Sequence, residues 1–364
     1  MNDRVSNCLS DLRQFDSQPS SEKIPFASVL VAAWNEEKHI SKCLDSIIAN
    51  DYPKDRMEIL VIDGMSGDRT REIVKDYASR SPLIRLVDNP KRYFPAAMNV
   101  GIENARGEVI LITSAHSLCD PKYVSACVRH QQESGAENVG GVLRIERGSE
   151  TGVGRAIASA LASKFGSGNS GVKTGVKVPT WADTAAFGCY RRKLFDEIGL
   201  FDERLLSSSD LDLNLRIRKT GGRILLVPEI EVQYFADATL GSFLRHNFAD
   251  GVWISYVMKF GKKAWSWRHW VPAAFVLSLV AAFALSAVNH RFLWLGLGIA
   301  AVYAAVNVVV SLQMAVRERD PHYAFLLPIV FAVRHFVHGT GTLYGLILVI
   351  LPGEHWKGRR GRKA

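Results

Sequence analysis

The sequence is poor in cysteine and lacks an apolar segment at its start. Its cysteines are odd in number and form no C-x-x-C pair: Cys8, Cys43, Cys119, Cys127 and Cys189. This pattern predicts neither a disulfide framework nor a zinc site, and it is typical of a reducing compartment. Residues 1–24 form a polar leader without the apolar region of a secretion signal. We therefore expect no cleavable signal, and we expect the domain that follows to stay in the cytosol.

Acidic residues are too few to balance the basic ones. The chain of 364 residues carries 45 Lys and Arg against 36 Asp and Glu, a formal net charge of +9. Such a balance fits nucleic-acid binding, which needs cations and aromatics on one surface, or attraction to anionic lipid. Here the basic clusters, 259–268 and 357–363, flank apolar segments. Their positions favour a lipid bilayer as the partner, and we expect no nucleic-acid partner.

Short apolar runs alternate with helical patterns over the first two thirds of the chain. Runs of β-forming residues predict strands, and apolar residues at helical spacing predict helices. The predicted strands are 26–33, 58–63, 84–87, 108–113, 185–190 and 223–227, and the predicted helices are 37–49, 68–77, 96–105, 194–198 and 210–220. The alternation predicts an α/β domain, residues 25–238, with a mostly parallel, doubly wound sheet. Ligands of such sheets bind beyond the carboxyl ends of the strands.

Residues 148–178 interrupt this alternation. The segment is rich in Gly, Ser and Ala and has few large apolar residues. This composition predicts a mobile loop that substrate would order.

Residues 239–269 combine an apolar stripe with aromatic and basic residues. The stripe repeats at helical spacing through Phe243, Leu244, Phe248, Val252 and Tyr256. An amphipathic helix of this composition favours the bilayer interface. The alternative is a helix whose stripe faces a protein core.

Residues 270–352 are long enough and apolar enough to enter a membrane. The runs 271–288 and 292–314 predict a hairpin of two spanning helices. A third run, 325–351, contains Arg334, His335 and His338 and a Gly-Thr-Gly break. We interpret it as a third span or a re-entrant hairpin, and the positive-inside rule favours the hairpin because 353–364 is a basic tail. Its ionisable residues contact a lipid head group or diphosphate, or pair within the break.

Polar side chains follow the predicted strands where a crevice should form. Asp63 ends one buried strand, and Asn35 and Glu36 follow another. A carboxylate at Asp63 can accept hydrogen bonds from a nucleobase, or it can cap a helix N-terminus. The residues by themselves leave both interpretations open.

Several motifs in a fixed order resemble those of the inverting family 2 glycosyltransferases with the GT-A fold. They are A-x-N-E, V-I-D-G-x-S-x-D-x-T, A-x-N-x-G-I, F-G-x-Y-R-R, G-L-F-D-E and S-D-L-D-L-N-L-R-I-R-K-x-G-G, between Ser28 and Tyr234. The pattern is most similar to the ExoA-type transferases of bacterial succinoglycan and other exopolysaccharide assembly, which also end in membrane helices.

The resemblance implies a role for individual positions. Asp63 would bind the nucleobase, Glu36 would lie near ribose and base, and Asp210 would deprotonate the acceptor hydroxyl. Ser114, Ala115 and His116 fall where the family has the D-x-D that holds the diphosphate through a divalent cation. Further residues are expected at the donor (Ala33, Asn35 and Asn99) and at the acceptor or a phosphate (Asp183, Arg191, Asp212 and Arg245). Asp210 as a simple helix cap, and Arg191 as a solvent-facing residue, are the alternatives.

The resemblance implies single-sugar transfer by a membrane enzyme. The donor would be a nucleotide-diphosphate sugar, with UDP expected, and the acceptor a polyprenyl phosphate or a polyprenyl-(di)phosphate-linked sugar. The place would be the cytosolic face of a bacterial inner membrane. The Q-x-x-R-W of processive synthases is missing, and Arg245 stands in the corresponding segment.

One position departs from the family pattern. Ser114 replaces the first acidic residue of the D-x-D, and His116 ends it. Imidazole binds Mn²⁺, whereas Mg²⁺ prefers oxygen ligands, so the cofactor is expected to be Mn²⁺ or Mg²⁺ held with one carboxylate fewer. Ser114 also supports an alternative function, a non-catalytic scaffold subunit of a glycan assembly complex.

Overall fold

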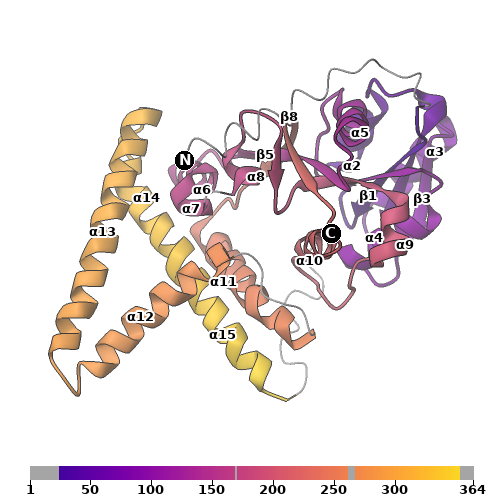
Figure 1. Ribbon diagram of the computed structural model, residues 1–364. Helices are drawn as coiled ribbons and strands as arrows, with labels where there is room; N and C mark the ends of the chain where they lie inside the picture. Colours follow the sequence, from indigo (N-terminus) through magenta and orange to yellow (C-terminus); the bar gives the residue numbers. More distant parts are fainter. Residues whose placement is uncertain (1–23, 169, 261–266, 353–364) are drawn as a thin grey trace.

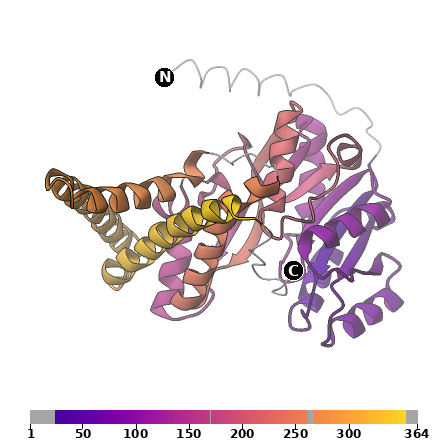
Figure 2. The same cartoon turned by 90° about the horizontal axis from the view of Figure 1, so that it is seen from below.

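A computed structural model describes residues 24–168, 170–260 and 267–352. An α/β domain carries the first part of this chain, and long helices extend from one side of it (Figures 1 and 2). The polar leader up to residue 23, the basic tail 353–364 and part of the basic cluster before the apolar runs lie outside the described residues.

The centre of the α/β domain is one eight-stranded sheet in the order β3-β2-β1-β4-β7-β5-β8-β6. Its first four strands are parallel, and β5 pairs in parallel with β8, whereas β7 and β6 pair antiparallel. The mostly parallel sheet is confirmed. The strands are β1 (Ala27–Ala33), β2 (Met57–Asp63), β3 (Ile84–Asp88), β4 (Val109–Ser114), β5 (Asn138–Glu146), β6 (Thr180–Ala182), β7 (Ala186–Arg191) and β8 (Ile224–Phe235).

Helices cover both faces of the sheet. One apolar core holds residues of α2 (Ile40–Ile48), α3 (Thr70–Arg80) and α5 (Tyr123–Ser134) against β1 and β2. A second core, on the other face, holds residues of α4 (Phe94–Asn104), α9 (Arg192–Ile198) and α10 (Ser209–Lys219). Every residue of β1 and β2 is buried, as expected for strands of a parallel sheet that is covered on both sides.

The segment predicted as a mobile loop is helical. It contains α6 (Gly152–Ala162), α7 (Lys164–Ser167) and α8 (Gly171–Thr174). Ala156 and Ile157 of α6 lie in a core with Leu327 and Phe331 of the C-terminal helices. The prediction was wrong because a segment rich in small residues can be either a flexible loop or a closely packed helix. The sequence of the segment does not distinguish these two cases, since the outcome depends on the helix that packs against it.

Helix α11 (Leu240–Tyr256) turns most of its apolar stripe toward protein. Phe243, Val252 and Tyr256 are buried, whereas Leu244 is exposed. A Cβ at Gly251 would collide with the carbonyl oxygen of His338 on α15 (His338–Ile350). The stripe therefore packs against protein, as the core-facing alternative predicts. Contact with the bilayer interface, which was the favoured prediction, does not account for its position. Two short 3₁₀ turns follow, Val257–Phe260 and Trp267–His269.

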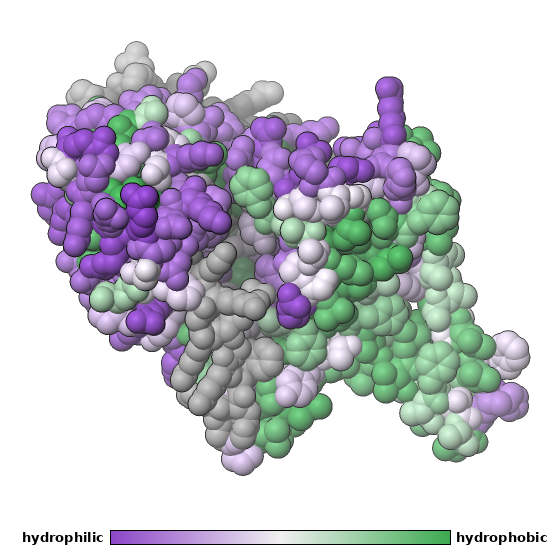
Figure 3. Space-filling view, turned by 180° about the vertical axis from the view of Figure 1, so that it is seen from behind, coloured by the Kyte–Doolittle hydropathy of each residue, from purple (hydrophilic) through white to green (hydrophobic). Residues whose placement is uncertain are grey.

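The C-terminal helices are α12 (Val271–Leu285), α13 (Arg291–Glu318), α14 (Tyr323–Ala332) and α15, with a π-helical turn at Val333–Val337 joining the last two. Residues 291–318 and 323–350 are long and apolar enough to cross a membrane. Residues 323–350 form one continuous helix, so the re-entrant hairpin was wrong. Helix α12, with 15 residues, is shorter than the roughly 20 that span a bilayer. Figure 3 shows apolar residues covering these helices, in contrast to the hydrophilic α/β domain.

Candidate active site

Three parallel strands end side by side and bring the predicted donor residues together. The register pairs Ala33 at the end of β1 with Asp63 of β2, and Ala32 with Ser114 of β4. The amide of Ala115 donates to the carbonyl of Ala32 at 3.0 Å. The carboxyl edge of the sheet thus collects Ala33, Asp63, Ser114 and Ala115, as expected for a ligand crevice of an α/β fold.

Asn35 shapes the loop after β1. Its φ of 55° lies in the left-handed region that Asn tolerates better than most residues. From there its side-chain oxygen accepts from the amide of Gly67 at 2.8 Å, and its own amide donates to Ser66 Oγ at 2.9 Å. Asn35 therefore fastens the β1 loop to the β2 loop, and its expected contact with a nucleotide remains a prediction.

The carboxylate of Asp63 is fully buried and engaged inside the protein. It accepts from the Ser66 amide at 3.0 Å and from the Ser66 hydroxyl at 2.5 Å. Arg71 of α3 donates to it at 2.6 Å and also to Asp88 at 2.8 Å. The structure thus shows Asp63 ordering the loop before α3. Its role toward a nucleobase stays a prediction.

Glu36 and His116 face each other across the crevice. Glu36 Oε1 lies 3.4 Å from His116 Nδ1, and Ser114 Oγ lies 3.4 Å from His116 Nε2. Glu36 is buried, whereas the His116 side chain is 49% exposed. Among the described residues there is no cluster of three His, Cys, Asp or Glu side chains that could hold a metal by itself. One carboxylate and one imidazole fit a cation whose other ligands are substrate and water oxygens.

Asn99 contacts a different part of the chain from the one expected. Its amide nitrogen donates to the carbonyl of Phe201 at 2.9 Å, and its oxygen accepts from the Phe201 amide at 2.9 Å. Its nitrogen also reaches Glu203 Oε1 at 3.2 Å. Asn99 therefore links α4 to the segment before α10, so it positions that segment. A donor contact for Asn99 remains a prediction.

Asp210 and Asp212 are two residues apart on α10 and have opposite environments. Asp210 lines a cavity, whereas Asp212 is buried and pairs with Arg216 at 2.9 Å. Arg216 in turn donates to the carbonyls of Ile198 and Leu200. Asp212 therefore fastens α10 to the neighbouring loop, and Asp210 is the carboxylate of the pair that a substrate can reach.

Surrounding protein favours the neutral form of Asp210. Burial, and the nearby charge of Asp250, raise its pKa, whereas hydrogen bonds from backbone amides and the charge of Lys173 lower it. The balance raises the pKa above the ordinary value of 3.8. A raised pKa brings a carboxylate closer to the range in which it accepts a proton effectively.

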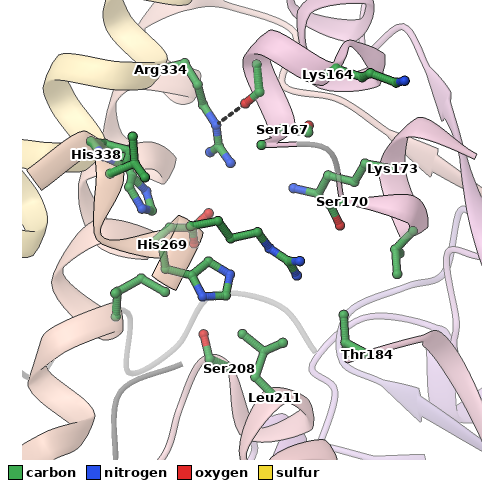
Figure 4. Close-up of a pocket in the computed structure, with 18 of the residues that line it drawn as sticks. Lys164, Ser167, Ser170, Lys173, Thr184, Ser208, Leu211, His269, Arg334 and His338 are labelled. Carbon is green, nitrogen blue, oxygen red and sulfur yellow. Dashed lines mark hydrogen bonds between the residues drawn. The ribbon is translucent and has the colours of Figure 1, made fainter. Parts of the chain in front are cut away.

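The cavity that holds Asp210 has a volume of about 830 Å³ and lies between the α/β domain and the C-terminal helices. Thr184 and Ala185, just before β7, line its wall, and β7 pairs with β4, whose end carries Ser114. Figure 4 shows Arg334, His338, Lys173 and His269 around its centre. Strand β7 thus connects the crevice at the sheet edge with the cavity.

Comparison with known proteins gives this arrangement a context. Residues 28–199 match the family model described as glycosyl transferase family 2. These residues form a family 2 glycosyltransferase domain. The match contains the three strand ends of the crevice and the cavity-lining helices α7 and α8, whereas Asp210, Asp250 and Arg334 of the cavity lie beyond it.

Two curated relatives extend over most of the enzyme. A transferase of Methanococcus voltae, named as a dolichyl N-acetyl-glucosaminyl phosphate diacetamido-dideoxy-glucuronosyltransferase, is 26% identical over 331 residues, 88% of this chain and 97% of that protein. The succinoglycan biosynthesis protein ExoA of Rhizobium meliloti is 26% identical over 326 residues, 88% of this chain and 96% of that protein. The resemblance to ExoA-type transferases is confirmed.

A solved structure shares the fold. A mannosyltransferase of Pyrobaculum calidifontis, in complex with GDP-mannose and Mn²⁺, superposes with a TM-score of 0.56 at 19% sequence identity. The similarity covers 90% of this chain and 93% of that one. The GT-A fold of the glycosyltransferase is confirmed.

Three predicted acceptor residues are placed outside the cavity. Arg191 pairs in register with Val109, at the opposite end of β4 from Ser114, so its proposed phosphate contact at this crevice is wrong. Arg245 is exposed on α11 and does not line the cavity, so its expected acceptor contact stays a prediction. Asp183 forms an ion pair with Arg268 at 2.8 Å and stands beside the lining residue Thr184.

Two cavity residues of the glycosyltransferase escaped prediction. Lys173 lies on α8, inside the segment expected to be a loop, and Asp250 lies on α11, between Phe248 and Val252 of the apolar stripe. No local sequence pattern predicts that either residue lines a cavity. The sequence does contain one indication of the cavity itself: Arg334 lies within an apolar helix, and an ionisable residue there indicates a buried polar partner or a cavity.

Proposed function

We propose that the glycosyltransferase moves a single sugar from a nucleoside-diphosphate donor to a hydroxyl of a lipid-linked acceptor in exopolysaccharide or cell-surface glycan synthesis. The observation that carries the proposal is the position of Asp210. Its carboxylate lies in a cavity with the catalytic domain on one side and the apolar C-terminal helices on the other. The curated names of two relatives, a dolichyl-linked transferase and a succinoglycan biosynthesis protein, support the acceptor class.

The reaction needs one base and no enzyme nucleophile. The acceptor hydroxyl oxygen bonds to the anomeric carbon of the donor sugar while the bond from that carbon to the diphosphate oxygen breaks. The hydroxyl proton passes to the Asp210 carboxylate, and the nucleoside diphosphate leaves with the electron pair. Attack opposite the leaving group inverts the anomeric centre. A raised pKa makes Asp210 a better proton acceptor than an ordinary surface carboxylate.

The donor would bind at the carboxyl edge of the sheet. Ala33, Asn35, Asp63 and Ser114 line this edge, and UDP is the expected nucleotide. His116 and Glu36 would hold a divalent cation, with Mn²⁺ favoured over Mg²⁺ because imidazole is a ligand. When bound, such a cation neutralises the charge of the leaving diphosphate. The residues themselves orient the phosphates and the ribose.

The enzyme would work at the cytosolic face of a bacterial inner membrane. Two helices are long and apolar enough to cross a bilayer, and the second of them contributes Arg334 and His338 to the wall of the cavity. This arrangement would keep the catalytic domain beside an acceptor that cannot leave the membrane.

The competing function is a scaffold subunit that binds the donor without turnover. The substitution of Ser114 for the acidic residue of the D-x-D favours it. The presence of Asp210 in a cavity, instead of in a cap alone, favours catalysis. A UDP-sugar that binds but never turns over at high Mn²⁺ would support the scaffold.

Transfer into lipid tests the proposal. Membranes containing the full chain would be incubated with radiolabelled UDP-sugars and Mn²⁺, and the organic extract would be counted. We expect label in the extract from one donor, and its loss in the Asp210→Asn variant. No incorporation from any common donor, with or without Mn²⁺, would contradict the function.

A further inference from the structure

The start of the apolar helix 323–350 rests on the α/β domain. The Tyr323 hydroxyl lies 3.0 Å from the Ser159 hydroxyl of α6. Leu327 and Phe331, one and two turns further on, lie in one buried core with residues of α6. Helix α6 follows β5 of the central sheet, so this end of the long helix is fixed to the domain.

The middle of helix 323–350 also contacts the α/β domain. Arg334 donates through Nε to the carbonyl of Gly166 at 3.1 Å. The next residue, His335, has its Nε2 at 3.0 Å from the carbonyl oxygen of Phe165. Both carbonyls belong to α7. An ionisable side chain in the middle of a lipid-crossing helix is costly, whereas these two side chains bond to the backbone of the domain.

The far end of the helix is held in the same way. Figure 1 shows α15 beside α11, and the two helices are in contact. The Ser255 hydroxyl of α11 donates to the carbonyl of Thr342 at 2.7 Å, and Lys259 donates to that of Leu348 at 3.1 Å. Leu348 lies in a buried cluster that includes Leu205, from the segment between α9 and α10. This end is therefore also fixed to the domain.

Contacts at both ends exclude a crossing of the bilayer by this helix. Its 28 residues make it about 42 Å long, against about 30 Å for the hydrocarbon core of a membrane. A helix that crosses the core has its ends on opposite sides. The α/β domain is built on one sheet, so it lies on one side only. A helix that touches this domain at both ends lies beside the membrane and does not cross it.

The face of the helix that is turned away from the domain is apolar. Its exposed side chains include Phe325, Ile329, Tyr344, Ile347 and Ile350. Neighbours in each half are three or four residues apart, which places them on one helix face. Figure 3 shows that this face is continuous with the apolar surface of the other C-terminal helices. An exposed apolar surface of this extent indicates an interaction site, and its continuity with a candidate span indicates lipid.

Helices α12 and α13 have a different relation to the domain. Val271, the first residue of α12, lines the cavity, and Ala315, near the end of α13, packs in the core with α6. The turn that joins the two helices lies away from the domain (Figure 1), and Val288 in this turn is exposed. The pair therefore forms a hairpin that touches the domain only where it begins and ends.

We propose that helix 323–350 lies in the plane of the cytosolic leaflet, with its apolar face on lipid and its other face on the domain. Only the α12–α13 hairpin then enters the bilayer deeply. This proposal goes beyond the transfer reaction and takes from the proposed function only the cytosolic place of the domain. The basic tail that follows the helix stays in the cytosol, as the positive-inside rule favours. The cavity wall formed by Arg334 and His338 lies about 10 Å, one helix diameter, from lipid.

The depth of spin labels in the bilayer tests this placement. The full chain, reconstituted in vesicles of phosphatidylethanolamine and phosphatidylglycerol, would carry one nitroxide at a time, on Phe325→Cys, Thr340→Cys or Ile347→Cys. Val302→Cys, at an exposed position of α13, is the matched control. The four cysteines within the described residues are buried, and Cys8 is replaced by serine. Collisions of the label with oxygen and with a water-soluble nickel complex give its depth.

We expect the three labels on helix 323–350 at one shallow depth, about 5–10 Å below the membrane surface. The Val302→Cys label should lie deeper, toward the bilayer centre about 15 Å below the surface. A Thr340→Cys label as deep as the control, between two shallow ends, would show a crossing helix and overturn the proposal. Labels shielded from both collision partners would indicate a protein on this face, and labels fully open to nickel would indicate water. Either result also overturns it.

Reporters fused after the last residue give an independent test in cells. A fluorescent protein that matures only in the cytosol should fluoresce, and alkaline phosphatase, which is active only outside it, should be inactive. Active phosphatase would place the C-terminal end across the membrane and contradict the proposal. The transfer reaction is scored separately, because neither measurement depends on turnover. Transfer into lipid by a chain whose third helix crosses the bilayer would refute this placement alone.

Discussion

Glu36 and His116 follow different strands, yet Oε1 of the one lies 3.4 Å from Nδ1 of the other. The parallel pairing of β1 with β4 brings them together. Glu36 is buried and His116 is half exposed, so the first side chain is held inside the protein and the second is accessible from the crevice. A carboxylate with an imidazole is a donor set for Mn²⁺ rather than Mg²⁺.

The first prediction concerns this pair. His116→Asp replaces imidazole by carboxylate and should shift the metal preference of transfer from Mn²⁺ toward Mg²⁺. His116→Ala should weaken metal activation about tenfold or more, since a ligand is lost. Titration of each cation after chelator treatment measures both effects. Identical metal dependence in wild type and both variants would exclude His116 as a ligand.

The second prediction separates Asp210 from Asp212. Asp210→Asn should lower the transfer rate by about a hundredfold or more, the usual contribution of a general base, with the donor KM unchanged. It should also raise the thermal midpoint, because it removes a charge that burial disfavours. Asp212→Ala breaks the buried pair with Arg216 and should cost about 3 kcal/mol of unfolding free energy. Full activity in Asp210→Asn would disprove the base.

The third prediction is a bell-shaped dependence of transfer on pH. On the acid side the rate should fall as Asp210 gains a proton, at a pH above 3.8 because its pKa is raised. A carboxyl group whose pKa is raised by folding binds its proton more tightly in the folded protein. Asp210 therefore contributes to the free energy of unfolding at low pH, and this contribution is lost as the pH rises through its pKa in the folded state. On the alkaline side Lys173 loses its charge, because burial lowers its pKa to about 8.

The two limbs of this profile are assigned by variants. Above about pH 8 the transfer rate should fall in the wild type, because the cavity then lacks the charge of Lys173 near Asp210. In Lys173→Arg the alkaline limb should move to higher pH, because Arg keeps its proton. An alkaline limb that stays in place in Lys173→Arg would belong to another group.

The fourth prediction tests the two roles left open for Asp63. Arg71→Met removes the cation that pairs with its buried carboxylate and should cost about 3 kcal/mol of unfolding free energy. Asp63→Asn keeps the shape, but its single side-chain oxygen replaces two carboxylate oxygens that accept from Ser66 and Arg71. It should weaken UDP binding if the carboxylate also recognises the base. Unchanged UDP affinity in Asp63→Asn would leave loop ordering as its task.

The fifth prediction concerns the contact that fixes the membrane helices to the catalytic domain. A side chain at Gly251 would meet the backbone of His338, whereas Gly298 on α13 has open space around it. Gly251→Ala should therefore destabilise the chain by about 1–3 kcal/mol. Gly298→Ala, the control, should not destabilise the chain, because Ala is favoured over Gly in a helix interior by about 0.5–1 kcal/mol. Thermal unfolding in detergent compares the two, and equal effects would contradict the close crossing of α11 and α15.

Local sequence patterns determined the sheet and the crevice of this protein. Strand ends at Ala33, Asp63 and Ser114 follow from apolar runs that are complete within a few residues, because burial on both faces needs continuous β-forming sequence. Parallel pairing then places these ends at one edge. The order of motifs around them indicated the family, and the length of 291–318 indicated a candidate span.

Tertiary structure alone decided how the acceptor side is built. Lys173 and Arg334 meet in one cavity although 160 residues separate them, and no periodicity within either segment encodes that meeting. Register removed Arg191 from the crevice, and packing against α15 turned the stripe of α11 inward. Gly and Ala in α6 formed a helix because α14 covers it. A contact between distant segments depends on the shapes of both segments, and the local sequence of one segment determines only its own shape.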